Sequence, residues 1–467
     1  MEPFIGMPPD AARSEEIEAL LRRQAITETV AYVERLAGQG MTPAFAQWLF
    51  ARIDGWYLEG HFDAMQRVYA LLEPFMAQPW EIWHSLGYRA DLLGEFALAK
   101  TYYERTLARR PDHAYTALAL AQLAMMHSGF REGRGGYDIR FIARRPDDNG
   151  PDWRHLPIAR WQGEPLRGKR LYLWVEQGVG DVLMFMGFLP HLLAEGPAHI
   201  TLGVYDKLIP LLARAFPGIT VESLEHVSDH VVAPALLQRP NLAQELAAMP
   251  PEQRAPLEKS YARALHYKPY DYAAPIGDMM VHGMAGYIPA RHPAYLKADP
   301  ALVREMEEAL PPRAQARRVG ISWFTANRRE GAIRSIPLAA WAPILRTPHC
   351  RFFSLQHHVS GEEIARVSGE QGFHIEPLSF DPTADVERLA ALIACMDVVI
   401  TIDNSNAHLA GALGIPTWML LPKGHDFRWP VQPDGGTLWY QSVEALRQTE
   451  SLDWEPVIAQ IARRLAA

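Results

Sequence analysis

Two different hydrophobic patterns divide the chain. From about residue 15 to residue 130, apolar positions recur at helical spacing, without strand-like alternation. From about residue 169 onward, short apolar runs alternate with amphipathic helical stretches, which is typical of βα units around a parallel sheet. The stretch between them is rich in Gly, Pro and Arg and has no sustained period. We therefore expect a helical domain over 1–130, a linker over 131–168 and an α/β region over the rest of the chain.

The helical region repeats at a fixed spacing. Its clearest unit resembles the tetratricopeptide pattern of about 34 residues, through Trp83, Leu86, Gly87, Gly94, Phe96, Ala99, Tyr103 and Pro111. The small residues Gly87 and Ala99 would let the two helices of the unit approach closely. We expect two to three repeats plus a cap at 15–37, as a tetratricopeptide-type α-solenoid. Such repeats either only support the rest of the chain as a small bundle, or form a concave groove that holds an extended peptide.

The α/β region is predicted to form two Rossmann-like domains that face a cleft, over 169–310 and 311–467. In the first we expect strands at 170–176, 199–205, 219–224 and 230–234, with helices at 181–195 and 207–216. In the second we expect strands at 319–323, 350–356, 373–378, 397–402 and 416–422, with helices at 337–346, 361–371, 385–396 and 405–413. The stretch 311–318 is a plausible hinge, and the long segment 241–287 of the first domain receives no element.

Ligands of open α/β sheets lie beyond the carboxyl ends of the strands, so the strand-to-helix turns are the places for chemistry. The first such turn is EQGVGD, in which Gly178 and Gly180 permit a tight turn close to a ligand. Asp181 would stand at the start of the following helix, where it could act as a general base toward an acceptor hydroxyl. The other interpretation of Asp181 is a plain helix N-cap.

The second turn follows the buried run VVITI. Asp403 ends the strand, and Asn404, Ser405 and Asn406 start a helix whose free amides and dipole would hold a diphosphate without a metal. His408 lies one turn further and could point to the ligand. Equally, His408 could be a hydrogen-bonded histidine of the core.

The third turn, GISWFTANRREGAIRSIP, places Thr325, Asn327 and Arg334 after a strand, together with Arg328 and Arg329. Arginines in such a loop suit phosphate through bidentate contacts. A solvated basic loop is the alternative, above all for Arg328 and Arg329.

A set of motifs in fixed order carries a resemblance. EQGVGD, GISW, RSIPLAAWAPIL, FFSLQ, DNSNAHLAGALG, DFRWP and LWYQS, after the repeats, resemble bacterial tetratricopeptide-fused glycosyltransferases. The catalytic part of that family is similar to the heptosyltransferase-like family 9 and, more distantly, to O-linked N-acetylglucosamine transferases, all of GT-B fold. The resemblance covers roughly residues 83–467.

The resemblance implies an inverting, metal-independent transfer of a sugar from a nucleotide diphosphate. Asp181 matches the family's base, Arg334 a basic residue near the phosphates, and Asp403 to His408 the nucleotide-sugar turn. Gln356, in FFSLQ, joins the expected donor site. Asn404 departs from the Thr of related chains, and the segment 241–287 looks longer than its counterpart, which leaves the sugar and the acceptor open.

Composition removes several classes of function. The net charge of −8 and the scattered basic residues argue against nucleic acid as a partner. No apolar run has the length of a membrane span, and the first residues lack the cationic start of a signal peptide. Two cysteines, Cys350 and Cys395, cannot make a disulfide framework. We expect a cytoplasmic protein without a cofactor beyond its nucleotide-sugar substrate.

Three functions remain as hypotheses from the sequence. The first is a glycosyltransferase whose repeats capture a protein acceptor, such as flagellin or another surface protein, and so raise its local concentration. The second is a glycosyltransferase that acts on lipid-linked or polysaccharide acceptors. The third is a non-catalytic scaffold that keeps the GT-B fold.

Overall fold

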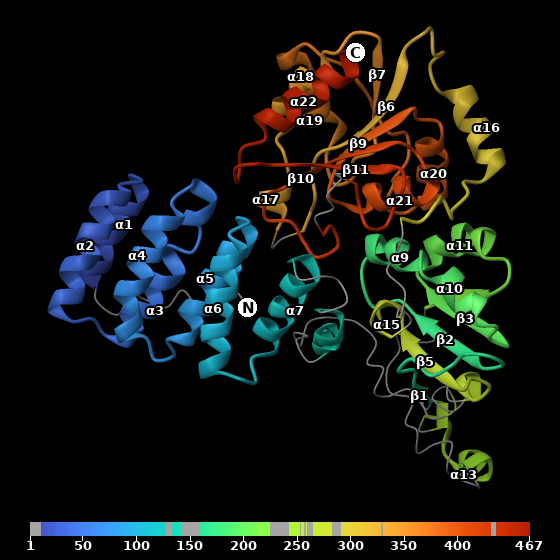
Figure 1. Ribbon diagram of the computed structural model, residues 1–467, viewed down its shortest axis with the longest axis horizontal. Coiled ribbons are helices and arrows are strands. Elements are labelled where there is room, and N and C mark those ends of the chain that lie inside the picture. The colour runs from blue at the N-terminus through green and yellow to red at the C-terminus, as the bar shows by residue number, and fades with distance from the viewer. Residues whose placement is uncertain are drawn as a thin grey trace.

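The computed structural model describes residues 11–127, 133–141, 158–224, 242–252, 254–255, 258, 265–282, 291–327, 330–430 and 436–467. A row of helices lies beside two separate parallel sheets, each with its own helices (Figure 1). Among the described residues, no helix combines the length and the apolar content needed to cross a bilayer.

The amino-terminal row is helical, as the spacing of apolar residues predicts. It consists of α1 (Ala11–Arg22), α2 (Ile26–Gln39), α3 (Pro43–Arg52), α4 (Phe62–Leu72), α5 (Trp80–Leu92), α6 (Phe96–Arg109) and α7 (Ala114–His127). Neighbouring helices pack as α1 with α2, α2 and α3 with α4, α5 with α6, and α6 with α7 (Figure 1). A Cβ on Gly87 would lie 2.7 Å from the Tyr103 ring, so this glycine does allow α5 and α6 to approach closely.

The first sheet is parallel throughout, in the order β1-β5-β2-β3-β4. Its strands are β1 (Ala159–Arg160), β2 (Arg170–Trp174), β3 (His199–Val204), β4 (Thr220–Ser223) and β5 (Tyr272–Pro275). Its helices are α9 (Val179–Met186), α10 (Leu189–Ala194), α11 (Ile209–Ala215), α13 (Leu242–Ala248) and α15 (Gly277–Val281). The strand expected at 230–234 lies outside the described residues.

One expectation for this domain is wrong, and one segment to which the sequence assigned no element holds a strand. The single helix expected at 181–195 is two helices, because Pro190 has no N–H to donate to the Met186 carbonyl and its ring clashes with that turn. The segment 241–287 does hold elements: β5 lies beside β2, with Leu171 paired to Tyr272. This strand has only four residues, YAAP, so its pattern was too short to recognise.

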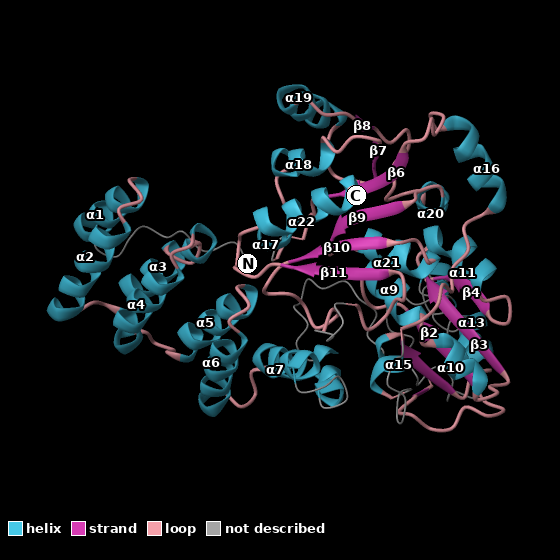
Figure 2. Ribbon diagram, turned by 45° about the horizontal axis from the view of Figure 1, so that its top comes forward, coloured by secondary structure: helices cyan, strands magenta, loops and turns pink. Residues whose placement is uncertain are grey.

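The second sheet is also parallel, in the order β11-β10-β9-β6-β7-β8 (Figure 2). Its strands are β6 (Arg317–Ser322), β7 (Cys350–Ser354), β8 (Ile375–Glu376), β9 (Val398–Ile402), β10 (Thr417–Leu421) and β11 (Val443–Arg447). Its helices are α16 (Pro300–Ala309), α17 (Gly331–Arg334), α18 (Ala342–Leu345), α19 (Gly361–Gln371), α20 (Val386–Ala394), α21 (Ser405–Leu413) and α22 (Glu455–Ala466). The two sheets therefore confirm the expected βα pattern.

Smaller differences concern the edges of this domain. The helix expected at 337–346 is a 3₁₀ turn at Leu338–Trp341 followed by the short α18, which has a proline in its first turn. β6 begins at Arg317, inside the stretch expected to be a hinge. α16 precedes that stretch and yet packs on α20, with an ion pair of 2.7 Å between Glu305 and Arg388.

The helical row is fixed to the second domain at the turn between α5 and α6. Lys423 pairs with Glu95 at 2.8 Å, and the Ser451 hydroxyl donates to the Leu93 carbonyl. Gly424 lies so close to this turn that a Cβ on it would overlap the backbone carbonyl of Leu92. The position of the helices relative to the second sheet is thus set by backbone contacts that leave no room for a side chain.

We predict that Gly424→Val separates the helical row from the second domain, because the Leu92 backbone cannot yield without moving the turn. Small-angle scattering should show a larger radius of gyration, and thermal unfolding should split into two steps. The matched control is Gly361→Val in the same domain, where an added Cβ meets nothing within 4 Å. An unchanged radius for Gly424→Val would show that this contact does not hold the two parts together.

Candidate active site

The helix starts of the two α/β domains border one cavity of about 520 Å³. Gly180 and Asp181 reach it from the first domain, at the start of α9. The second domain supplies the rest of the wall: Thr325, Asn327, Glu330, Arg334, His357, Asp403, Asn404, Ser405, His408 and Arg428. The structure thus brings most of the predicted site residues together; Gly178, Gln356 and Asn406 are not part of the wall.

The two domains meet where α9 crosses α21. A Cβ on Gly180 would lie 3.0 Å from Cδ2 of His408 and 3.6 Å from the Cα of Ser405. Because the helix starts are this close, the amide end of α21 and the carboxylate of Asp181 face the same space. A Cβ on Gly178, in contrast, would approach only Oδ2 of Asp181, at 3.9 Å.

The start of α21 is held by a buried polar network. Oδ1 of Asn404 accepts from the Asn406 amide at 2.9 Å, and its Nδ2 donates to the Ser322 hydroxyl at 2.8 Å. The Asn406 side chain points away from the cavity and donates to the Leu355 carbonyl at 3.0 Å. The backbone N–H of Ser405 belongs to the helix-start amides that have no intrahelical acceptor, and Ser405 lines the cavity. An anion in the cavity could accept from it.

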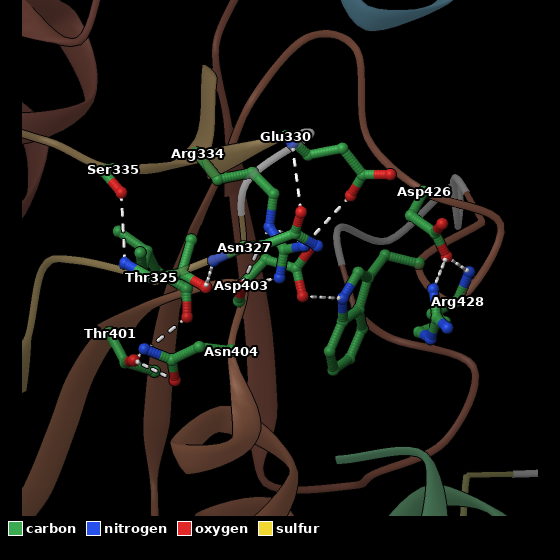
Figure 3. Close-up of polar contacts among 12 residues, drawn as sticks. Thr325, Asn327, Glu330, Arg334, Ser335, Thr401, Asp403, Asn404, Asp426 and Arg428 are labelled. Carbon is green, nitrogen blue, oxygen red and sulfur yellow. Dashed lines mark hydrogen bonds and ion pairs between the residues drawn. The ribbon is translucent and has the colours of Figure 1, made fainter. Parts of the chain in front are cut away.

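Asp403 and Arg334 face each other behind this helix start (Figure 3). Oδ1 of Asp403 accepts from the Trp429 indole at 2.7 Å, and its Oδ2 lies 3.3 Å from Nε of Arg334. Arg334 also donates to the Asp403 carbonyl and, at 3.1 Å, to Glu330. Burial alone would lower the pKa of Arg334, but the carboxylates of Asp403 and Glu330 outweigh it and raise the pKa. The guanidinium is thus charged, and each of its three nitrogens already has a hydrogen-bond partner.

The turn after β6 is shaped by its own side chains. Oδ1 of Asn327 accepts from the Glu330 amide at 3.2 Å, and Oγ1 of Thr325 accepts from the Asn327 amide at 3.4 Å. Gln356 lies buried beneath the turn and accepts from the amides of Trp323 and Phe324, both at 2.9 Å. Gln356 therefore supports the turn, whereas Thr325 and Asn327 stand at the cavity. Arg328 and Arg329 lie outside the described residues.

His408 is buried among aromatic rings and also forms part of the cavity wall. Its ring stacks on Trp429 at 4.6 Å between centroids, and a hydrogen bond of 2.9 Å joins its Nδ1 to the Tyr440 hydroxyl. Burial lowers the pKa of His408 to about 3, so the imidazole is neutral near pH 7. A neutral ring at this place can donate or accept one hydrogen bond but brings no charge to an anion.

Asp181 does not cap its helix. The N-cap of α9 is Gly178, which makes no side-chain cap bond, and Asp181 lies in the first helical turn. Nε of Arg428 donates to Oδ1 of Asp181 at 2.6 Å, across the two domains. No hydrogen bond joins Oδ2 of Asp181 to another described residue. The plain N-cap interpretation is therefore wrong, and the carboxylate keeps one oxygen for the cavity.

Three wall residues received no role from the sequence: Glu330, His357 and Arg428. Arg428 lies in the motif DFRWP, one of the motifs that carry the family resemblance. That motif was the signal in the sequence that could have indicated a functional role for Arg428. Nη1 of Arg428 donates to Asp426 at 2.6 Å. Glu330 lies in the third turn; burial, and then the nearby Asp426, raise its pKa.

A group of possible metal ligands lies elsewhere among the described residues, in Asp138, Asp278 and His282. Arg160 donates to both oxygens of Asp278, at 2.7 and 2.8 Å, and Arg140 donates to Oδ1 at 2.7 Å. These two arginines take the place of a cation at Asp278. The group is therefore an ion-pair network of the first domain.

A second, larger cavity of about 1000 Å³ runs along the helical row. Helices α5, α6 and α7 line it with aromatic and polar side chains that include Trp80, His84, Tyr103, Tyr115 and Gln122. Its other wall is the loop 424–428, and it shares Glu330, Arg334 and Arg428 with the smaller cavity. The groove of the helices thus ends at the cavity between the two sheets.

Known proteins are similar to this chain in sequence and in structure. No family model matches the sequence. The chain is 31% identical over 393 residues to Protein FlbA of Caulobacter vibrioides, covering 82% of this chain. It spans only 61% of the length of FlbA.

Solved structures similar to the chain include glycosyltransferases. A glycosyl transferase of family 9 from Veillonella parvula is 15% identical and covers 66% of this chain and 99% of its own, with a TM-score of 0.44. An O-GlcNAc transferase from Thermobaculum terrenum is 14% identical and covers 99% of this chain and 91% of its own, with a TM-score of 0.33.

We predict that Gly180→Val destabilises the protein by about 1–3 kcal/mol, because its side chain would be forced against His408 and α21. Chemical denaturation measures this difference. The control is Gly369→Val, another helical glycine, with nothing within 4 Å of an added Cβ. Equal stability of the two variants would mean that α9 and α21 can separate at no cost.

Proposed function

We propose that this chain is a glycosyltransferase of GT-B fold, which moves a sugar from a nucleotide-diphosphate donor to a protein acceptor with inversion and without a metal. The observation that supports this most is the single cavity with a carboxylate on one wall and a helix start on the other. The motif order and the class of the similar proteins agree with it.

The two walls have complementary chemistry. We infer that the diphosphate lies at the start of α21, where Ser405 offers a free amide and the helix dipole favours negative charge. Thr325, Asn327 and the charge of Arg334 border the same space. These groups would stabilise the diphosphate as the bond between the anomeric carbon and its oxygen breaks.

On the opposite wall, Asp181 is the proposed base. Oδ2 of Asp181 would take the proton of the acceptor hydroxyl, whose oxygen forms the new bond to the anomeric carbon on the face opposite the leaving diphosphate. Base and leaving group then lie on opposite sides of the anomeric carbon, as inversion requires, and each is held by a different domain. Neither step needs a cation, because helix amides and arginine carry the stabilising charge.

The helical row is proposed to select the acceptor. We infer that the row is a tetratricopeptide-type solenoid, and that an extended polypeptide lies in its groove and reaches the donor at the shared end near Glu330. Holding the polypeptide there raises the local concentration of its hydroxyl side chains.

We predict that Asp181→Asn lowers sugar transfer by roughly 100-fold or more, because the amide cannot accept the proton. Binding of the nucleoside diphosphate should not weaken, which calorimetry measures. A variant that transfers at the wild-type rate would remove Asp181 from the chemistry and leave Glu330 as the next carboxylate of the wall.

We predict that the groove variant Tyr115→Ala/Gln122→Ala lowers kcat/KM for a protein acceptor by at least about tenfold, while donor binding is unchanged. Leu58→Ala is the control, since Leu58 is exposed in the helical row and does not line the groove. Undiminished transfer by the groove variant would favour a lipid-linked or polysaccharide acceptor. If the wild-type protein binds no nucleoside diphosphate at all, the chain is a scaffold.

A further inference from the structure

Among the described wall residues, Arg428 makes an ion pair that joins the two α/β domains directly at the cavity. Its three guanidinium nitrogens contact Asp181 at 2.6 Å, Asp426 at 2.6 Å and, more weakly, Gln177 at 3.4 Å. Asp181 and Gln177 come from the first domain, whereas Asp426 comes from the same loop as the arginine. The guanidinium also lines both the cavity and the groove of the helices.

The backbone of Arg428 is held in place, so only its side chain can change partners. The Trp439 indole donates to the Arg428 carbonyl, and the next residue, Trp429, is tied to Asp403 and stacked on His408. The side chain of Arg428 is about one quarter exposed, at 24%, which gives it contact with the cavity.

The charge of the wall shows why a change of partner is needed. Asp181, Glu330 and Asp403 are the carboxylates of the cavity, against Arg334 and Arg428. Each Arg334 nitrogen is bound to the Asp403 carbonyl or to Glu330. A diphosphate brings at least two negative charges, and its strongest partner in proteins is a guanidinium that can bind two oxygens at once. Of the two wall arginines, Arg428 is the one whose carboxylate partner, Asp181, belongs to the other domain. Its hydrogen bond to Asp181 is therefore the one that can be exchanged for a bond to the diphosphate.

We propose that Arg428 exchanges Asp181 for the diphosphate of the donor, and so keeps the base occupied until the donor is bound. This inference rests on the proposed function. The donor's phosphates compete with Asp181 for the guanidinium, and the released carboxylate then has both oxygens available for the acceptor. Donor therefore binds before acceptor.

The competing account is that Arg428 only holds Asp181 in position and never touches the donor. The two accounts differ once Asp181 carries no charge. If Arg428 binds the donor, the Asp181→Asn substitution removes the carboxylate that competes for its guanidinium. The affinity of this variant for a diphosphate should then rise severalfold. Replacing Arg428 in that variant should then weaken diphosphate binding. If Arg428 only positions Asp181, the same replacement should leave diphosphate binding unchanged, because no aspartate remains to be positioned.

The experiment measures binding of ADP, UDP, GDP, CDP and inorganic pyrophosphate to the full chain by calorimetry. Four proteins are compared: wild type, Asp181→Asn, Asp181→Asn/Arg428→Met, and Arg447→Met. Arg447 donates to the carbonyls of Trp429 and Pro430 in the same loop and does not line the cavity, so it controls for disturbance of the loop. A fifth protein, Asp181→Asn/Arg428→Lys, keeps the charge should the methionine variant not fold.

We expect the best-bound diphosphate to bind Asp181→Asn severalfold more tightly than wild type. The Met double variant should bind at least tenfold more weakly than Asp181→Asn, the Lys double variant should fall between them, and Arg447→Met should match wild type. Affinities of Asp181→Asn and both double variants within twofold of one another would overturn the inference, as would an equal loss in Arg447→Met. If neither wild type nor Asp181→Asn binds any of the probes, the donor site itself is wrong, and the inference fails with it.

Discussion

The close approach of α9 and α21 is the contact on which the candidate site depends. It places the starts of two helices from different sheets on one cavity. Glycine at residue 180 favours this approach, because a Cβ there would lie only 3.0 Å from the His408 ring. The ion pair of Asp181 and Arg428 crosses the same boundary at 2.6 Å. A pair of Rossmann-like domains alone would not bring a carboxylate and free helix amides together; this packing does.

The second constraint is the rigid attachment of the helical row. The Leu92 carbonyl lies where a side chain at Gly424 would be, and Lys423 pairs with Glu95. These contacts hold the helical row so that its groove leads toward the cavity. Glu330, Arg334 and Arg428 belong to the walls of both spaces. If the groove holds a polypeptide, these three side chains are the ones it meets at the point of transfer.

The sequence predicted the parts of the site that depend on local pattern. The buried run VVITI followed by Asn404 was enough to expect β9 and the start of α21, because a strand, an N-cap residue and a helix leave their signals within about ten residues. It could not tell which polar side chains at a strand end turn inward. Asn406 and Gln356 satisfy backbone groups behind the wall, and Asp403 faces Trp429 and Arg334. Arg428, the partner of Asp181, is 247 residues away along the chain, and no local sequence pattern indicates such a pair.

The most direct test of the account is a crystal structure of the protein with the nucleoside diphosphate that binds best, grown with a chelator so that no divalent cation is present. The account predicts phosphate oxygens within hydrogen-bond distance of the Ser405 amide, with Asp181 across the cavity from them. A diphosphate bound elsewhere, or bound at this place only through a metal ion, would contradict it.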